Sequence, residues 1–287
     1  MGKSEATLRA YRTDWAIFGT WCDRRRLEAL PATPATVIAF IEAQREAGLA
    51  VPTLRRRLAA IRARHQERGY GNPTDDPEVR AALAPGKRPG DERAPARKEA
   101  LLPDRLAALL GAVPADTLEG VRDRALILLG FAGAFRRSDL VAIRVDQLEW
   151  QREGVLVGVA GRRVPIVKGR VLCPVAALRA WLDASGIDAG PVFRSFTPRG
   201  DLRPGAMRPE MVARKLKRYA RAAGFPPAEV ARLAAHSLRS GFVTAALANG
   251  ADVFRVMEVS GHISAQTVRD YVRSAKPFFD HAGDGLL

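Results

Sequence analysis

The sequence predicts a mainly α protein of the α+β class, with two helical domains and one small antiparallel β-sheet or hairpin in the second. Apolar residues recur at three- and four-residue steps through most of the chain, which is the period of a helix. A stretch rich in Pro, Gly and basic residues at 85–100 separates the two parts. Residues 154–167 show the short apolar runs typical of a β-hairpin. A length of 287 residues suits two domains, each with its own core.

The first domain, residues 1–84, is expected to contain four helices. Thr33 followed by Pro34 is typical of the start of the second helix, because Thr caps free N–H groups and Pro suits the first turn. The third helix begins near Pro52, and the fourth spans residues 76–83. The apolar stripe of the first helix consists of Leu8, Tyr11, Trp15, Phe18 and Cys22, and that of the third consists of Leu54, Leu58, Ile61 and His65.

Arginines flank the apolar stripe of the third helix on both sides. Their guanidinium groups form an outer surface able to follow a phosphate backbone. The alternative is a helix face that is rich in arginine and merely solvated. The arginines are Arg57, Arg64 and Arg68 on one side and Arg55 and Arg62 on the other.

Residues 85–100 are expected to form an extended basic linker between the domains. The segment contains three prolines, two glycines and no large apolar side chain. Its positive charges would let it lie along a phosphate backbone. They are Lys87, Arg88, Arg93, Arg97 and Lys98.

The second domain, residues 101–287, is expected to be mostly helical. Residues 118–134 predict a largely buried helix, and residues 154–167 predict two short strands around a turn at Gly161-Arg162. The helix at 209–223 is expected to bury Val212, Leu216 and Tyr219 and to point Arg214, Lys215, Lys217, Arg218 and Arg221 outward. The remaining predicted helices span residues 173–185, 236–248, 253–259 and 265–272.

Composition narrows the class of partner. The chain carries 46 Lys and Arg against 31 Asp and Glu, a formal charge of +15, which favours a polyanionic partner over a merely solvated basic surface once the placement of the charges is considered. Cys22 and Cys173 form no CxxC pair, which argues against a disulfide framework or a zinc site and fits a reducing cytoplasm. The longest apolar run is shorter than the ~18 residues of a membrane helix.

Four short segments carry residues suited to phosphoryl chemistry. An attacked phosphodiester develops negative charge on its non-bridging oxygens, and the forked donors of Arg136 and Arg239 suit those oxygens. A helical His-x-x-Arg places His236 and Arg239 on one face, so both can address one phosphate. The segments are Phe135–Leu140, His236–Arg239, Ser260–His262 and the isolated Tyr271.

Tyr271 is the candidate nucleophile. A phenol has an unperturbed pKa of about 10, so it needs a cationic pocket or a base in order to attack near neutral pH. Each assignment has a structural alternative. Arg136 is otherwise a surface charge at the end of a helix, His236 a satisfied core histidine, and Tyr271 a half-buried side chain with its hydroxyl at the surface.

The order and spacing of these segments resemble the tyrosine recombinase (phage integrase) family. That family shows Arg-x-Ser-Glu/Asp-Leu after a buried helix, then His-x-x-Arg, then Leu-Gly-His, and a Tyr nine residues beyond the His. Here Arg136-Arg137-Ser138-Asp139-Leu140 fits the first motif, and Tyr271 lies nine positions after His262. The resemblance implies that His236 has an acid/base role, that His262 hydrogen-bonds the phosphate, and that Tyr271 forms a 3′-phosphotyrosyl bond. It implies no cofactor, metal or ATP.

The resemblance also implies an organisation and partners. Residues 1–84 would be a SAM-like core-binding domain, 85–100 a basic linker and 101–287 the catalytic domain. The partner would be double-stranded DNA with inverted-repeat sites, bound by a homotetramer on two sites, with a monomer or weakly associated protein when free. The protein would be cytoplasmic and nucleoid-associated, with no membrane. The expected DNA-binding residues are Arg55, Arg57, Arg62, Arg64, Arg137, Arg162, Arg163, Arg214 and Lys217.

The C-terminal tail carries apolar residues at its end. Apolar residues on a short terminal segment suggest that the tail docks on a neighbouring protomer. The alternative is that the tail packs on the core of its own chain. The residues are Phe278, Phe279, Leu286 and Leu287.

The chain departs from the family at the hairpin. The family carries a Lys a few residues before a segment such as Arg-x-Val-Pro-Leu, and this Lys protonates the leaving 5′ oxygen. No Lys precedes Arg162 in this hairpin, and Lys168 follows the second strand. Either Lys168 reaches back, or Arg162 or Arg163 partly substitutes, or cleavage is impaired. The alternatives to a recombinase are a sequence-specific DNA-binding protein with impaired catalysis and a type IB topoisomerase-like relaxation activity.

Overall fold

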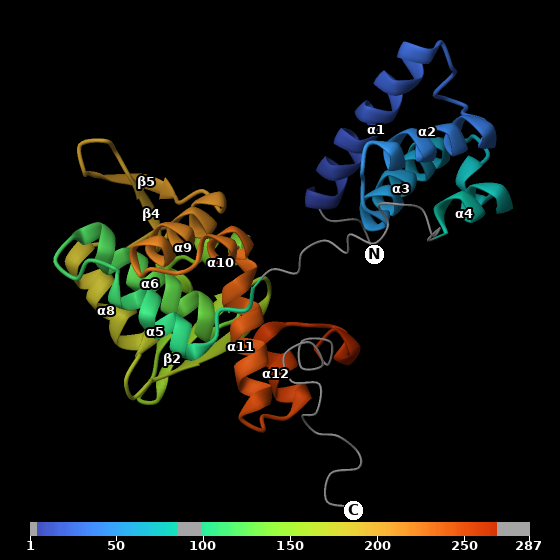
Figure 1. The fold of residues 1–287 in the computed structure, drawn as a ribbon. Helices are drawn as coiled ribbons and strands as arrows, with labels where there is room; N and C mark the ends of the chain where they lie inside the picture. Colours follow the sequence, from blue (N-terminus) through green and yellow to red (C-terminus); the bar gives the residue numbers. More distant parts are fainter. Residues whose placement is uncertain (1–4, 85–98, 269–287) are drawn as a thin grey trace, which may run out of the picture. The chain divides into compact units, whose positions relative to one another are not determined.

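The computed structural model describes residues 5–84 and 99–268, which fall into two compact units divided between Ala96 and Arg97 (Figure 1). The predicted linker lies almost entirely outside the described residues, as do Tyr271 and the C-terminal tail. The domain boundaries given above therefore stay predictions.

The first unit is helical in its described part. Thr33 caps the second helix as predicted, because its Oγ1 accepts a 3.2 Å hydrogen bond from the Thr36 N–H and Pro34 follows in the first turn. Asp76 caps the fourth helix by accepting a 2.8 Å bond from the Glu78 N–H. The elements are α1 (Glu5–Arg25), α2 (Pro34–Glu46), α3 (Val51–Glu67), a 3-10 turn (Pro73–Asp75) and α4 (Pro77–Leu83).

The core of the first unit lies where α1 packs on α3 and α2 packs on α4. The predicted stripe of α3 is confirmed, since Leu54, Leu58, Ile61 and His65 are all buried. The fully buried His65 accepts a 2.9 Å bond from the Ala32 N–H at Nε2, and its Nδ1 lies 2.9 Å from the Ile61 oxygen. The stripe predicted for α1 is wrong at Leu8, which is 45% exposed, because the core reaches α1 only from Trp15 onward.

The second unit is mostly helical with two small antiparallel sheets, so the mainly α prediction is confirmed. The strands are β1 (Leu148–Trp150), β2 (Gly154–Val159), β3 (Arg162–Val167), β4 (Arg194–Phe196) and β5 (Leu202–Ala206). The helices are α5 (Pro103–Gly111), α6 (Leu118–Ala132), α7 (Arg137–Ala142), α8 (Pro174–Ser185), α9 (Glu210–Ala222), α10 (Pro227–Arg232), α11 (His236–Ala248) and α12 (Val253–Ser260), and residues 265–268 are also helical. The β4–β5 hairpin, α5 and α10 were not predicted.

The centre of the second unit is α6, whose residues are buried over most of its surface, as predicted for this segment. Helices α7, α8, α9 and α11 and strand β3 all contact it (Figure 1). After α6 ends, Gly133 and Ala134 turn the chain into α7, and Ala134 takes the unusual φ of +46°. This turn brings Arg136 to the start of α7.

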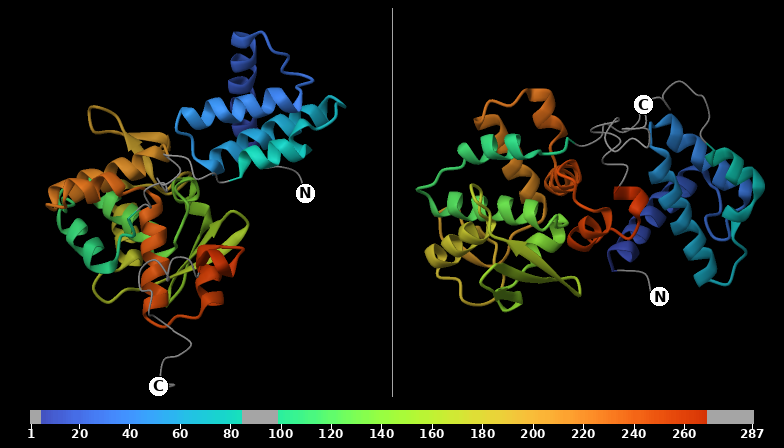
Figure 2. Two further views of the ribbon diagram at one scale, coloured as in Figure 1. Left: turned by 45° about the vertical axis from the view of Figure 1, so that its right-hand side comes forward. Right: turned by 90° about the horizontal axis from the view of Figure 1, so that it is seen from below.

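The three-stranded sheet has the order β1-β2-β3 and lies beside α12 (Figure 2). Val159 pairs with Arg162, so the two turn residues are Ala160 and Gly161, with φ values of +47° and +74°. Two consecutive positive φ values are typical of a type I′ turn, which matches the twist of the strands. The prediction of a turn at Gly161-Arg162 is wrong by one residue, because Ala160 takes a conformation that favours Gly or Asn.

The prediction that Lys215 points outward is wrong. The residue is 5% exposed, and its Nζ lies 2.6 Å from Glu119 and 3.1 Å from Asp123 of α6. Position 215 follows the buried Val212 by three residues and precedes the buried Tyr219 by four, which puts it on the inner face of α9. The position of Lys215 in the helical period therefore decides its burial, although the side chain is charged. The carboxylates of α6 compensate that charge.

Candidate active site

Arg136 occupies the N-cap position of α7, directly after the Ala134 turn. Its side chain is 55% exposed and lies 3.9 Å from the Asp139 carboxylate, one turn along the helix. Ser138 donates a 3.1 Å bond to the same carboxylate. Arg136 is therefore an oriented surface cation, with Asp139 beside it.

Arg239 is buried at 3% exposure on the first turn of α11. Its Nη1 donates a 2.7 Å hydrogen bond to the carbonyl oxygen of Ala134 and a second bond to that of Ser260. One guanidinium thus joins three segments: α11, the turn before Arg136 and the end of α12. His236, three residues earlier, begins the same helix, so the predicted shared face is present.

His262 follows the end of α12, where Gly261 takes a left-handed conformation with φ of +66°. Such a residue ends a helix and redirects the chain, and Gly adopts it without steric cost. The Nδ1 of His262 lies 2.8 Å from the Oγ of the fully buried Ser260. The imidazole is thus held by the helix end that Arg239 also contacts.

The electrostatics show that four predicted groups share one site. Burial and then the charges of Arg239, Arg136 and His236, in that order of effect, together lower the pKa of His262 to about 4. Packing around the His236 imidazole, then Arg239 and Arg136, lowers the pKa of His236 as well, although the residue retains exposed surface. Both imidazoles are therefore neutral near pH 7, beside two guanidinium groups that favour an anion.

Among the hairpin candidates, the structure brings Arg162 to this site and leaves Lys168 apart from it. The Nη1 of Arg162 donates to the carbonyl oxygens of Glu258 and Val259, at 3.0 and 3.4 Å. Lys168 follows the far end of β3, where its N–H donates to the Glu153 oxygen at 3.2 Å. The two positions are six residues apart along an extended chain, about 20 Å at ~3.3 Å per residue.

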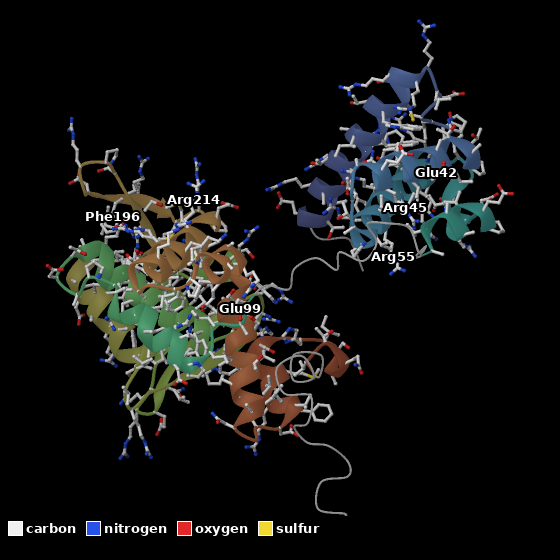
Figure 3. The ribbon with its side chains drawn as sticks, viewed as in Figure 1. Glu42, Arg45, Arg55, Glu99, Phe196 and Arg214 are labelled. Carbon is white, nitrogen blue, oxygen red and sulfur yellow. The ribbon has the colours of Figure 1, made fainter. Side chains whose placement is uncertain are left out.

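Five of the residues predicted to bind DNA have exposed surface, and Figure 3 shows Arg214 projecting from α9. Three others are held by protein groups. Arg57 is only 13% exposed and lies 3.8 Å from Asp14, Arg64 donates a 2.7 Å bond to Glu67, and Lys217 donates a 3.1 Å bond to the Ala231 oxygen. The exposed five are Arg55, Arg62, Arg137, Arg163 and Arg214.

Sequence reasoning missed Ser260. Its carbonyl accepts from Arg239 and its Oγ meets His262, so it contributes two contacts to the site. The signal was present, because Ser260 stands where the family motif has Leu. A buried hydroxyl in place of an apolar side chain indicates a hydrogen-bonding role.

None of the helices in residues 5–84 and 99–268 is long and apolar enough to span a bilayer. Within the same ranges, no group of three or more His, Cys, Asp or Glu side chains is arranged to hold a metal ion.

Comparison with known proteins identifies the family of both parts of the chain. The sequence profile of the phage integrase family matches residues 99–277, and that of the phage integrase N-terminal SAM-like domain matches residues 2–68. An integrase/recombinase xerD homolog of Selenomonas ruminantium is 34% identical over 296 residues, which covers 98% of this chain and 85% of that protein.

Solved structures share the fold. A lambda integrase tetramer bound to a Holliday junction matches 98% of this chain and 75% of that chain, with a TM-score of 0.64 and 14% identity. The XerH site-specific recombinase bound to a palindromic difH substrate matches 85% of this chain and 70% of that chain, with a TM-score of 0.62 and 16% identity. At this level of identity the likeness concerns the fold.

Proposed function

The chain belongs to the phage integrase family of tyrosine recombinases and is a site-specific DNA recombinase, and we propose that Tyr271 is its nucleophile. The observation that carries this proposal is the buried Arg239, which joins the segments of Arg136, His236 and His262 into one cationic site. The similarity to recombinases does not favour the alternative of a DNA-binding protein with impaired catalysis.

The proposed reaction is an in-line transfer of a phosphoryl group. The phenolic oxygen of Tyr271 attacks the scissile phosphorus, a 3′-phosphotyrosyl bond forms, and the bond to the 5′ oxygen breaks. Arg136 and Arg239 neutralise the charge that develops on the non-bridging oxygens. In the second step a 5′-hydroxyl attacks the phosphotyrosyl bond and the tyrosine leaves, so one phosphodiester replaces another without ATP.

The lowered pKa values of the two histidines suit the roles proposed for them. A neutral His236 accepts the phenolic proton of Tyr271, which a protonated imidazole does not do. A neutral His262 donates from one ring nitrogen to a phosphate oxygen while its Nδ1 meets Ser260. If Ser260 donates to Nδ1, the proton of His262 resides on Nε2, available to the phosphate.

The proposed partner is double-stranded DNA with inverted-repeat sites, bound by four protomers on two sites. Support comes from the formal charge of +15 and from the matched lambda integrase, which was solved as a tetramer on a Holliday junction. The apolar residues near the C-terminus are proposed to join neighbouring protomers, and the free protein to be monomeric or weakly associated. We propose that the protein acts on DNA in the cytoplasm and is associated with the nucleoid.

A nicked suicide duplex tests the nucleophile. The nick lets the short 5′-hydroxyl fragment diffuse away, so the covalent intermediate accumulates. The parent protein is expected to form an SDS-resistant adduct with the DNA, and Tyr271→Phe to bind the same duplex without forming it. An adduct of undiminished yield with Tyr271→Phe excludes Tyr271 as the nucleophile. DNA binding by the parent without any adduct contradicts the proposed reaction.

A further inference from the structure

We propose that Arg162 is a positioning residue that fastens the β2–β3 hairpin to the end of α12 and thereby fixes His262. The inference rests on the phosphate-binding role proposed for His262. It gives a function to the hairpin of a chain in which that hairpin has no lysine before Arg162.

The first evidence is the contact of Arg162 with the last turn of α12. Its Nη1 donates to the carbonyl oxygens of Glu258 and Val259. The last carbonyls of a helix lack partners within the helix and carry its partial negative charge. A guanidinium at this place satisfies them and is attracted to them, so the hairpin and the helix end are held together.

The second evidence is the fit of the Arg162 guanidinium against Gly261. A Cβ built on Gly261 would lie 2.5 Å from the Cζ of Arg162 and 2.7 Å from both Nη atoms. The guanidinium therefore rests directly on the Cα of the residue that precedes His262. The φ of +66° at Gly261 favours glycine, and a side chain at this position would displace the Arg162 guanidinium from its present place.

The third evidence is the difference between two adjacent arginines. Successive side chains of a strand point to opposite faces. Arg162 contacts the end of α12, whereas Arg163 is 72% exposed and lies 2.9 Å from Glu149 of β1, on the other side of β2. Arg163 therefore provides a matched control of the same charge, in the same strand, without the contact to α12.

Chemistry favours positioning over proton donation. Arginine keeps its protons far above neutral pH, which makes it a poor general acid for the leaving 5′ oxygen. The donor that faces Glu258 and Val259 is committed to backbone oxygens rather than to a phosphate. Arg162 instead fixes the position of the Gly261–His262 turn relative to Arg239, which donates to the Ser260 carbonyl oxygen.

The test compares Arg162→Ala, Arg162→Lys and Arg163→Ala on the nicked duplex. We expect Arg162→Ala to slow adduct formation by at least about tenfold, because small misplacements of a catalytic group cost that much or more. Lysine retains one donor for the carbonyls and should restore part of the rate. Arg163→Ala removes a residue predicted to bind DNA, so it should raise the DNA concentration needed for half-maximal adduct formation, and its loss of rate at saturating DNA should be smaller than that of Arg162→Ala. If Arg162→Ala forms the adduct as fast as the parent, the proposal is wrong.

Three further readouts separate positioning from other roles. If Arg162 acts through His262, Arg162→Ala should add little to the defect of His262→Asn, and additive defects contradict this. If Arg162 instead assists the leaving group, a 5′-bridging phosphorothiolate restores the rate of Arg162→Ala. If it contacts a phosphate, DNA affinity falls and the salt slope of binding drops by about one. Either of the last two outcomes rejects the proposal.

NMR of His262 tests the positioning role without depending on catalysis. The imidazole resonances of His262 in the full-length protein should move in Arg162→Ala and remain in place in Arg163→Ala. Unmoved resonances in Arg162→Ala reject the positioning role even if the protein forms no adduct. If the parent forms no adduct but the His262 resonances move in Arg162→Ala, the proposed function is wrong and the positioning role of Arg162 is still supported.

Discussion

Arg239 donates a 2.7 Å hydrogen bond from Nη1 to the carbonyl oxygen of Ala134, two residues before Arg136. The same nitrogen donates to Ser260, two residues before His262. A buried guanidinium thus sets the spacing of two segments that are far apart in the sequence. The site is therefore organised around a residue that also binds the phosphate in the proposed reaction, and its geometry depends on the fork of arginine.

Arg239→Lys tests this dependence. Lysine retains the charge but carries its three donors on one nitrogen, so binding both carbonyl oxygens leaves a single donor for a phosphate, whereas the arginine fork carries further donors on Nε and Nη2. We expect adduct formation on the nicked duplex to fall by about 10²- to 10³-fold, the usual effect of losing one transition-state donor. The exposed Arg137 provides the control, because Arg137→Lys should leave cleavage within a few fold. A parent rate for Arg239→Lys contradicts the central role of the fork.

The pKa of His262 predicts a pH dependence of stability. Its native pKa of about 4 lies below the unfolded value of about 6.5. Between these two pH values the imidazole is protonated in the unfolded chain and neutral in the native protein. The contribution of His262 to stability is complete above pH 6.5 and is lost as the pH falls toward 4. The facing charges of Arg136 and Arg239 and the neighbouring His236 all act in the same direction.

Thermal unfolding between pH 7 and pH 4.5 measures this effect. The loss of stability on acidification should be smaller in His262→Asn than in the parent, because the asparagine does not titrate. NMR of the parent should show the His262 imidazole titrating near pH 4, and a phosphate-bearing duplex should raise that midpoint. A midpoint near 6.5 in the free protein contradicts the cationic site described here.

Prediction from the sequence succeeded where one periodic pattern decided the outcome. The spacing of His236 and Arg239 placed them on one helix face, and the apolar run before Arg136 marked a buried helix. It failed where tertiary contacts decided. Lys215 is buried because Glu119 and Asp123 on α6 compensate its charge. The sequence around Lys215 does not predict these two contacts. The hairpin turn shifted by one residue because Ala160 accepts a positive φ.

Tyr219→Phe tests the buried ion cluster between α6 and α9. The Tyr219 hydroxyl donates a 2.6 Å bond to Asp123, and burial, followed by this carboxylate, raises the pKa of Tyr219. A hydrogen bond to a buried charge contributes about 2 kcal/mol, so the second unit should lose about that much free energy of unfolding. Tyr70→Phe, at a 45% exposed position, should change little in urea denaturation. Equal stabilities of Tyr219→Phe and the parent would show that the bond contributes nothing net.

Lys168→Ala tests the lysine that the sequence offered as general acid. The structure places Lys168 at the end of β3 opposite Arg162, and no described element brings it to His262. We therefore expect Lys168→Ala to cleave ordinary DNA at close to the parent rate, with the proton for the 5′ oxygen delivered by another group or by water. A large defect that a 5′-bridging phosphorothiolate repairs would instead assign the acid to Lys168, since a thiolate leaves without a proton. In that event the hairpin must rearrange on DNA, and the hydrogen bonds from Arg162 to the end of α12 would have to break during cleavage.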